Sequence, residues 1–457
     1  MGRNAPACVR ARRLIHPHVR SYERTDGQPT RVVLSTKRAP PFLLSIIPPI
    51  QTEICNFAPN DKQPMNKQDW TYKKLGDICE VINGFAFKSE KYVDKGIRVM
   101  RITNVQKGTI VDNDPKYYPN EEAPNIRQYL LNENDLLMSL TGNVGRVGLL
   151  QKELLPAALN QRVACLRIKS NDVLLKYLFH ILDSDLFEKD CIFNSSGIAQ
   201  KNMSTEWLKK YTIPVPPIEE QERIVAELDL LSGIIEKKKE QLKAYDQLVQ
   251  SIFYTMFGDP IDNPKGWETD ILVNLVSTDC SISYGIVQPG NEIENGIPVV
   301  RPVDLVNQIV TRKGLKQIKK RISDDYKRTI LKGGELLFCV RGTTGVMSFA
   351  SDDLKGCNVT RGITPLSFNE SINKYFAFHY LKTDGLQAMI ADNTRGIALK
   401  QINMKDVRAL PFLVPPLSLQ QEFAEKVEAI ERQKALVQQS IEETQTMFDC
   451  TMDKYFG

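Results

Sequence analysis

Histidine is scarce in this chain, with four among 457 residues, and the common catalytic motifs are absent. There is no Gly-x-x-x-x-Gly-Lys-Ser/Thr phosphate loop, no His-Glu-x-x-His zinc motif and no Gly-x-Ser-x-Gly nucleophile turn. The chain also lacks Asn-Pro-Pro-Tyr and a Gly-x-Gly-x-x-Gly after a strand, so nothing indicates that it binds S-adenosylmethionine itself. We therefore predict no cofactor, no metal and no catalytic residue, and we expect a binding protein rather than an enzyme.

The nine cysteines include no Cys-x-x-Cys pair, so neither a zinc site nor a disulfide framework is indicated. A reducing cytoplasm is the expected compartment. No apolar run reaches the ~20 residues that a membrane helix needs, so no membrane partner is expected. A hydrophobic content of 42% and a charged content of 25% are typical of a globular protein, and 457 residues suffice for two or three domains.

Residues 1–64 differ from the rest in composition. They hold nine of the 25 prolines and a net charge of +6, which leaves −1 of the formal +5 for the remainder. Rich in arginine and poor in acids, they superficially resemble a transit peptide. We predict an atypical basic extension that is disordered or foreign to the native protein, whose translation would then begin at Met65. Any basic DNA-binding surface must therefore be local within the nearly neutral remainder.

The remaining sequence repeats itself about 200 residues apart, with the order of the matching blocks kept. This period is too long for a solenoid, whose repeats run roughly 20–50 residues. Two tandem domains of similar α/β or α+β fold are predicted at 65–217 and 259–416. The matching blocks include Gly96–Arg101 with Gly296–Arg301, Gly142 and Gly145 with Gly342 and Gly345, Gly197 with Gly396, and Pro216-Pro217 with Pro415-Pro416.

Within the first repeat, β-rich runs predict strands at Ile97–Val105 and Val163–Ile168. Apolar spacing predicts a helix at Lys176–Asp190, with Leu178, Phe179, Leu182 and Leu186 on one side. His180 and His379 occupy equivalent points on predicted amphipathic helices, which favours packing over metal ligation.

Long heptad patterns follow each Pro-Pro pair and predict helices at 218–258 and 417–457. Lys238, Lys434, Thr444 and Thr451 are the polar interruptions. Narrow apolar seams on long helices need a partner, and each helix is the obvious partner of the other. The alternative is that each helix lies on its own domain. The first seam is Ile224, Leu228, Leu231, Ile235, Leu242, Tyr245, Val249, Ile252 and Met256, and the second is Phe423, Val427, Ile430, Val437, Ile441, Phe448 and Tyr455.

Polar loops that recur in both repeats are the candidates for DNA contact. Paired glycines let a backbone approach phosphate closely, and Arg, Lys, Gln, Asn and Thr supply donors for bases and phosphates. Ordinary tight turns and solvated loops are the structural alternatives. The candidates in the first repeat are Lys88, Arg101, Thr141, Asn143, Arg146, Gln161, Arg162, Gln200 and Lys201. Those in the second are Tyr284, Arg301, Arg341, Thr343, Thr344, Arg361, Lys400 and Gln401, and Lys88 has no clear counterpart near Tyr284.

The sequence motifs around the two helices resemble those of the specificity subunits of type I restriction-modification systems, and the resemblance extends over residues 66–457. Five sequence motifs carry this resemblance. They are Pro216–Val225 at the start of the central helix, Met256–Pro260 and Asn263–Trp267 at and after its end, Pro415–Phe423 at the start of the last helix, and Tyr455–Gly457 at its end. Residues 1–64 depart from the family pattern.

The resemblance implies a non-catalytic subunit whose target-recognition domains each read half of a split double-stranded DNA sequence. It implies that the helices form an antiparallel coiled coil that separates these domains. It further implies partner modification subunits, which methylate adenine, and restriction subunits, which translocate DNA. The competing hypotheses are a protein-interaction scaffold that never touches DNA and an enzyme that acts on DNA directly.

Overall fold

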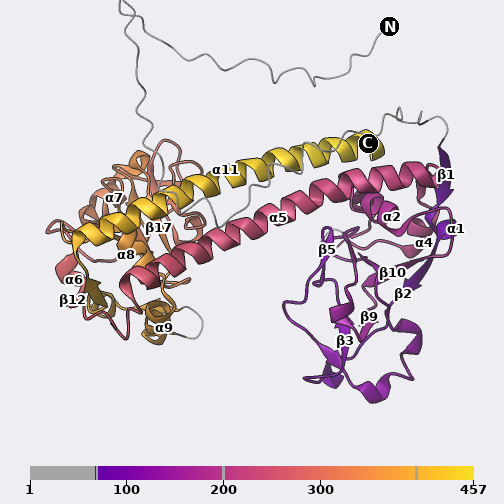
Figure 1. Ribbon diagram of the computed structural model, residues 1–457, viewed down its shortest axis with the longest axis horizontal. Coiled ribbons are helices and arrows are strands. Elements are labelled where there is room, and N and C mark those ends of the chain that lie inside the picture. The colour runs from indigo at the N-terminus through magenta and orange to yellow at the C-terminus, as the bar shows by residue number, and fades with distance from the viewer. Residues whose placement is uncertain (1–66, 68–69, 198–200, 397–399) are drawn as a thin grey trace, which may run out of the picture. The chain divides into compact units, whose positions relative to one another are not determined.

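The computed structural model describes residues 67, 70–197, 201–396 and 400–457 (Figure 1). The expectations for residues 1–64 and for a start at Met65 lie outside these described residues. No helix among the described residues is long and apolar enough to cross a membrane.

The first domain combines short sheets with small helices. Its central sheet has the strand order β2-β10-β7-β8, and a second sheet has the order β6-β3-β9. The strands are β1 (Thr71–Lys74), β2 (Cys79–Asn83), β3 (Ile97–Met100), β4 (Val105–Gln106), β5 (Thr109–Ile110), β6 (Tyr117–Tyr118), β7 (Leu136–Ser139), β8 (Val147–Leu149), β9 (Ala157–Leu159), β10 (Val163–Ile168) and β11 (Thr212–Val215). The helices are α1 (Leu75–Ile78), α2 (Leu175–Leu182), α3 (Asp185–Phe193) and α4 (Thr205–Lys210).

The second domain repeats this plan. Its sheets have the orders β14-β17-β16-β19 and β15-β13-β18. The strands are β12 (Glu268–Ile271), β13 (Ile297–Val300), β14 (Ile309–Val310), β15 (Lys316–Ile318), β16 (Leu336–Cys339), β17 (Met347–Ala350), β18 (Asn358–Val359), β19 (Ile363–Leu366), β20 (Thr394–Arg395), β21 (Gln401–Ile402) and β22 (Pro411–Val414). The helices are α6 (Leu272–Leu275), α7 (Lys320–Asp324), α8 (Lys374–Leu381), α9 (Asp384–Asp392) and α10 (Met404–Arg408).

The two domains share strand pairing as well as composition. In each, the first and last strands pair antiparallel, as β1 with β11 and β12 with β22. In each, one strand of the three-stranded sheet pairs parallel with a later strand, as β3 with β9 and β13 with β18. The predicted fold class, two tandem α/β (α+β) domains of similar fold, is confirmed.

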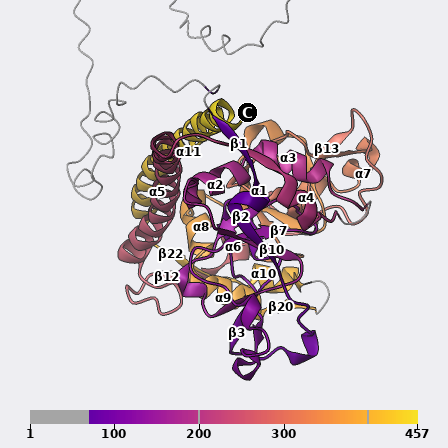
Figure 2. The same cartoon turned by 90° about the vertical axis from the view of Figure 1, so that its right-hand side faces the viewer.

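Two long helices, α5 (Ile218–Phe257) and α11 (Leu417–Phe456), run side by side in both perpendicular views (Figure 1 and Figure 2). Arg223 of α5 donates to the Tyr455 hydroxyl at 3.0 Å, near the end of α11. Farther along α5, the rings of Phe253 and Phe423 lie 5.6 Å apart, centroid to centroid. Residue numbers rise on one helix as they fall on the other, so the helices pair antiparallel and the predicted coiled coil is confirmed.

Three of the four polar interruptions of the seam make cross-helix contacts, whereas Thr451 donates to the Met447 carbonyl of its own helix. Lys238 Nζ donates to Ser440 Oγ at 2.6 Å and to Thr444 Oγ1 at 3.0 Å. Lys434 Nζ donates to Asp246 at 2.8 Å. Because each polar group finds its partner in one alignment only, these contacts favour a single register of the two helices.

The seam of α5 shifts at its carboxyl end. The fully buried residues there are Phe253 and Phe257, whereas Ile252 and Met256 are half-buried. Four-residue steps from Val249 follow the 3.6-residue period of a helix, which drifts from a strict heptad. The drift turns these rings into the core of the second domain, so the heptad pattern placed this last stretch one residue too early.

A predicted helix at Lys176–Asp190 is in fact two helices, α2 and α3, so that prediction was wrong. The side chain of Ser184 accepts a hydrogen bond from the Phe187 N–H and caps the start of α3. Leu186, expected on the buried side, is 47% exposed because the break rotates the second helix. Similarly, the predicted strand Ile97–Val105 ends at Met100, where the chain turns before β4.

Each domain core includes residues from both long helices. The first contains Ile224 and Leu228 of α5 together with Met452 and Tyr455 of α11. The second contains the carboxyl end of α5 and the amino end of α11. The helices are therefore integral to both domains, and they fix the orientation of each domain relative to the pair formed by α5 and α11.

Buried glutamines fasten the start of each helix to its domain. Gln221, fully buried, accepts from Leu174 N at 2.8 Å and donates to the carbonyls of Asp172 and Pro216, both at 2.8 Å. Gln420 repeats this arrangement with the Asn373 N–H and the Ser371 and Pro415 carbonyls. The recurring Pro-Pro-x-x-x-Gln pattern thus encodes a rigid junction.

Candidate nucleic-acid interface

The hairpin between β7 and β8 carries the first pair of candidate glycines. Gly142 has φ 77° and Gly145 has φ 84°, in the left-handed region that favours glycine. A Cβ on Gly145 would lie 2.8 Å from Cys191 of α3, so this glycine allows the hairpin to pack. A Cβ on Gly142 would meet nothing within 4 Å. The outer side of this turn is therefore open to an approaching ligand.

Backbone hydrogen bonds hold the other candidate loops beside this hairpin. Gln161 N donates to Phe85 O at 2.9 Å, and Leu140 N donates to Arg162 O at 2.9 Å. On the other side of the hairpin, Gly142 N donates to Lys201 O at 2.9 Å. Four segments that are far apart in sequence, at 84–88, 139–146, 160–162 and 201–203, thus form one continuous set of loops, here called the first loop cluster.

The second domain builds the same frame. Arg361 N donates to Ile286 O at 2.8 Å, Val340 N to Gly362 O at 2.7 Å, and Gly342 N to Lys400 O at 2.8 Å. The segments 284–288, 339–346, 360–362 and 400–402 form the second loop cluster. Gly342 also has a positive φ, of 90°, and a Cβ there would meet nothing within 4 Å.

The structure also aligns the two domains where the sequence comparison found no match. Phe85 bridges in parallel to Asn160, and Ile286 bridges in the same way to Thr360. A Cβ on the preceding Gly84 would lie 2.1 Å from Asn160 O, and one on Gly285 would lie 2.3 Å from Val359 O. Tyr284 is therefore the counterpart of Asn83, whereas Lys88 aligns with Pro289.

Side chains in the second cluster are organised around Tyr284. The Arg361 guanidinium carbon lies 5.6 Å from the centroid of the Tyr284 ring, a cation–π contact. Gln401 Nε2 donates to the Tyr284 hydroxyl at 3.0 Å. Three predicted residues from three separate loops are thus brought together.

Side chains in the first cluster are more open. Thr141 donates to Asn202 Oδ1 at 2.9 Å, whereas Asn143, Gln161, Arg162 and Lys201 are exposed. Within the described residues, the Arg162 guanidinium has no hydrogen-bond or ion-pair partner, so its donors face solvent.

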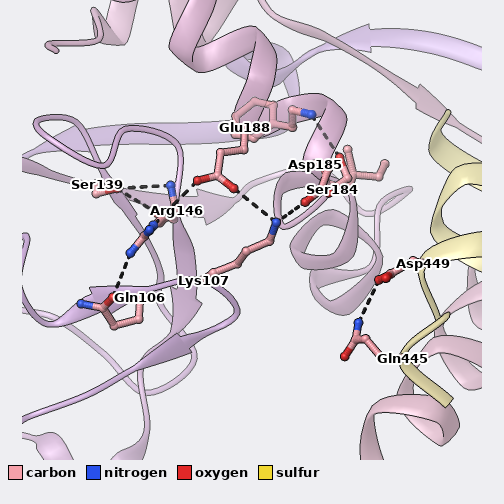
Figure 3. Close-up of polar contacts among 11 residues, drawn as sticks. Gln106, Lys107, Ser139, Arg146, Ser184, Asp185, Glu188, Gln445 and Asp449 are labelled. Atoms are coloured by element: carbon pink, nitrogen blue, oxygen red, sulfur yellow. Dashed lines mark hydrogen bonds and ion pairs between the residues drawn. The ribbon is translucent and has the colours of Figure 1, made fainter. Parts of the chain in front are cut away.

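Three predicted arginines are instead engaged with their own domains. Figure 3 shows Arg146 between Gln106, at 3.0 Å, and Glu188, at 3.7 Å. Arg101 pairs with Asp114 at 3.2 Å, and Arg301 pairs with Asp304 at 2.8 Å. These contacts hold the loops in shape, and they reduce the donors that remain for a ligand.

The other candidates lie at the margins of the clusters. Lys88 and Lys400 are exposed, as is Thr343. Thr344 accepts a hydrogen bond from Thr394 at 3.1 Å, and Arg341 is half-buried with an Nε that has no hydrogen bond in the described part of the chain. Gln200 lies outside the described residues.

Phe193, which the motif search missed, stands out beside the first cluster. It is 87% exposed, at the end of the helix whose Cys191 packs against the hairpin. The counterpart of Phe193 in the second repeat is Asp392, so the two domains differ here in both charge and polarity. The predicted helix ended at Asp190, three residues before Phe193, and no recurring motif includes Phe193, so no signal in the sequence pointed to it.

A cleft of about 1030 Å³ between α2, α3 and the two long helices has a different character. Burial raises the pKa of Asp183 to about 7, although nearby Lys107 opposes this shift. Lys107 also lies between Asp185 and Glu188 at the edge of the cleft (Figure 3). Carboxylates lining this cleft repel phosphates, so the cleft does not fit a DNA backbone. They are Asp183, Asp185, Asp229, Glu236, Asp449 and Asp453.

His180 lies on the wall of this cleft, where its Nε2 is 2.9 Å from Asp229 Oδ1. Bonds from His180 and then Lys176 lower the pKa of Asp229. Among the described residues, no group of three or more His, Cys, Asp or Glu side chains is arranged to hold a metal ion. His180 therefore joins α2 to α5.

The model of the type I restriction modification DNA specificity domain matches the chain twice, at residues 67–244 and 288–445. The chain belongs to this family. Its function as a DNA specificity subunit is thereby established over the alternative of an interaction scaffold that never touches DNA. Each match covers most of one sheet domain together with part of the long helix that follows it.

Curated relatives share only modest identity with this specificity subunit. The EcoBI specificity subunit of Escherichia coli is 25% identical over 387 residues, which cover 79% of each chain. The putative MjaX specificity subunit of Methanocaldococcus jannaschii is 27% identical and covers 80% of this chain and 87% of its own. A chain solved in a study of complex assembly and conformational transition of the type I R-M system superposes with a TM-score of 0.51. It has 20% identity over 85% of this chain and 97% of its own, and this likeness concerns the fold.

Proposed function

We propose that this specificity subunit reads the two halves of a split double-stranded DNA target with its two loop clusters. The observation that carries the proposal is a shared frame with unlike side chains. Both clusters use the same backbone bonds, yet the first presents Asn83 and Gln161 where the second presents Tyr284 and Arg361. A common frame places the loops against the grooves, and different donors and acceptors then select different bases.

Within each cluster, the open glycine turns and exposed lysines suit phosphate contacts. Gly142 and Gly342 leave the backbone accessible, and Lys201 and Lys400 follow on the neighbouring loops. Arg162, Arg361, Gln161 and Gln401 carry the paired donors or amides that read base edges. Phe193 is added as an apolar contact, for which a thymine methyl group is a suitable partner.

The long helices act as a spacer between the two readers. Each has 40 residues, or about 60 Å at 1.5 Å per residue. One turn of DNA is about 34–36 Å, so a rod of this length can separate two half-sites by a fixed gap. The buried glutamines at both junctions support this role because they prevent each domain from pivoting on its helix.

The proposed division of the chain follows from these roles. Residues 65–217 and 259–416 form the target-recognition domains, and residues 218–258 and 417–457 form the spacer. Catalysis is assigned to separate subunits, since the loop clusters hold no set of acid, base and nucleophile. Modification subunits would methylate adenine in the recognised sequence, and restriction subunits would join the larger assembly, in line with the names of the relatives.

Sequencing of methylated adenines in cells with and without this gene tests the proposal. We expect a two-part motif with a constant gap that disappears when the gene is deleted. In parallel, the purified chain should shift DNA duplexes in a gel when modification subunits are added, and should neither cut nor methylate DNA alone. A motif with one part only, or one that persists after deletion, would contradict the two-reader proposal.

A further inference from the structure

Three side chains in the second loop cluster form an ordered unit whose geometry suits one base. Tyr284, Arg361 and Gln401 come from separate loops and are all half-buried. The Tyr284 ring is held by the Arg361 guanidinium, 5.6 Å away. Its hydroxyl in turn accepts a hydrogen bond from Gln401 Nε2 at 3.0 Å. The amide of Gln401 is therefore fixed before DNA arrives.

Fixing the amide determines what remains for a ligand. A primary amide has two N–H groups and one oxygen that accepts. Tyr284 takes one N–H, so one N–H and Oε1 of Gln401 remain, and neither has a partner among the described residues. A free N–H beside a free carbonyl oxygen matches the adenine edge in the major groove, where N7 accepts and the N6 amino group donates.

Among the described residues, the turn beside Gln401 is uncovered. Gln401 bridges to Arg341, the residue before Gly342. A Cβ on Gly342 would meet nothing within 4 Å, so no side chain of the described residues covers the turn beside the amide. A base edge can therefore reach the turn beside Gln401 without displacing any of the described residues.

We propose that Gln401 reads one adenine of the second half-site, and that Tyr284 is a positioning residue that holds the Gln401 amide in its reading orientation. This inference rests on the proposed function and assigns one base class to one side chain. The first domain lacks the device, because Asn83 stands where Tyr284 does, so the effect should be confined to the second half-site.

The test uses the complete complex with modification subunits and a duplex library in which each target position is randomised. Gln401→Ala should relax discrimination at a single position, occupied by adenine in the wild-type motif, by roughly 5- to 150-fold. Tyr284→Phe keeps the ring under Arg361 and removes only the hydroxyl. It should relax the same position by a smaller factor.

Matched controls separate these effects from general damage. Tyr375→Phe removes a hydroxyl that makes no hydrogen bond within the described residues, and Gln439→Ala removes an exposed amide of α11. Both variants should discriminate between bases at every target position as strongly as the wild type does. Thermal melting of each variant, together with the unchanged first half-site, shows that the domain is still folded.

Several outcomes would overturn the inference. One is that Gln401→Ala leaves base discrimination unchanged at all target positions. Another is that it weakens discrimination at a position that is not adenine in the wild-type motif. A Tyr284→Phe variant as strict as Tyr375→Phe would remove the positioning role. Loss of all methylation by a variant that melts like the wild type also overturns it, since one base contact cannot account for that. By contrast, a wild-type complex with no two-part motif would contradict the proposed function itself.

Discussion

At the scale of single residues, the loop clusters depend on glycines that have different tasks. Gly84 and Gly285 allow two backbones to lie in contact, whereas Gly142 and Gly342 supply a left-handed turn that faces open space. Of these four, the sequence predicts only Gly142 and Gly342 as candidate turn glycines and does not assign a role to Gly84 or Gly285. Only the structure separates the glycines that assemble the frame from those that expose it.

This distinction predicts opposite responses to the same substitution. Gly84→Ala would place a Cβ 2.1 Å from Asn160 O and force two loops apart, so we expect loss of first half-site recognition and a clear drop in melting temperature. Gly142→Ala meets no atom, and strain at φ 77° should cost only about 1 kcal/mol. Melting curves and methylation of the first half-site measure both. Equal effects of the two variants would contradict the assignment.

Asp183 provides a prediction about pH. Burial raises its pKa to about 7 from the usual 3.8, so the native state holds this proton more tightly than the unfolded chain does. Stability should therefore fall as pH rises from about 4 to about 7, and stay lowered above that. Asp183→Asn should relieve this loss, by on the order of 2 kcal/mol at pH 8, with a smaller gain at pH 5.

Urea unfolding at several pH values would measure the effect. Asp185→Asn is the matched control of opposite sign, because a hydrogen bond from Lys107 lowers the pKa of Asp185. That contribution is present above the unfolded pKa and is lost as pH falls, so the control should lose stability at neutral pH. If the difference in unfolding free energy between wild type and Asp183→Asn does not change with pH, the assignment to Asp183 is refuted.

At the scale of elements, the junctions between domain and helix rest on one glutamine each. Gln221→Ala would leave the Leu174 N–H and the Asp172 and Pro216 carbonyls without their partner in a buried site. We expect a loss of about 2–4 kcal/mol of unfolding free energy. Gln221→Glu keeps the acceptor and loses the donor, so it should not restore stability. Exposed Gln439→Ala is the control, and a loss no larger than its own would disprove the anchoring role.

Much of the element layout follows from the sequence, for a physical reason. Heptads and the Pro-Pro pairs predict the long helices because local periodicity determines a long helix. The features that the sequence did not predict depend on tertiary contacts. The shift to Phe253 and Phe257 arises because this end of α5 packs into the core of the second domain together with Phe423 of α11. Likewise, the loop clusters join residues such as Phe85 and Gln161 through backbone bonds that no local pattern contains.

At the scale of the whole molecule, the end of the chain completes the first domain. Phe456 is 8% exposed, and its ring lies 5.8 Å from that of Tyr177. Phe456→Ala should therefore destabilise the first domain by about 3 kcal/mol, although the two residues are far apart in sequence. Hydrogen exchange should increase in the first domain and stay unchanged in the second. Met447→Ala, at a position 60% exposed, is the control. Equal loosening of both domains would contradict this arrangement.

The spacer role predicts that the gap in the DNA target depends on helix length. Seven residues inserted after Lys239 and seven after Gln439 extend both helices at facing positions. The inserted residues lie between two sets of cross-helix contacts, so both sets are kept. The contacts of Lys238 with Ser440 and Thr444 remain on the side of the first domain, and the contact of Lys434 with Asp246 remains on the side of the second. Both seams stay in register, and the rod lengthens by about 10 Å.

That length corresponds to about three base pairs at 3.4 Å each, so the methylated motif should keep both half-sites and widen its gap by about three. Methylation should also be slower, because three base pairs rotate the second half-site by about 100° around the DNA axis while the helices keep their orientation. Four residues inserted in α5 alone would break the seam, and we expect that variant to lose the motif. An unchanged gap in the doubly extended chain would show that the domains find their half-sites independently of the rod.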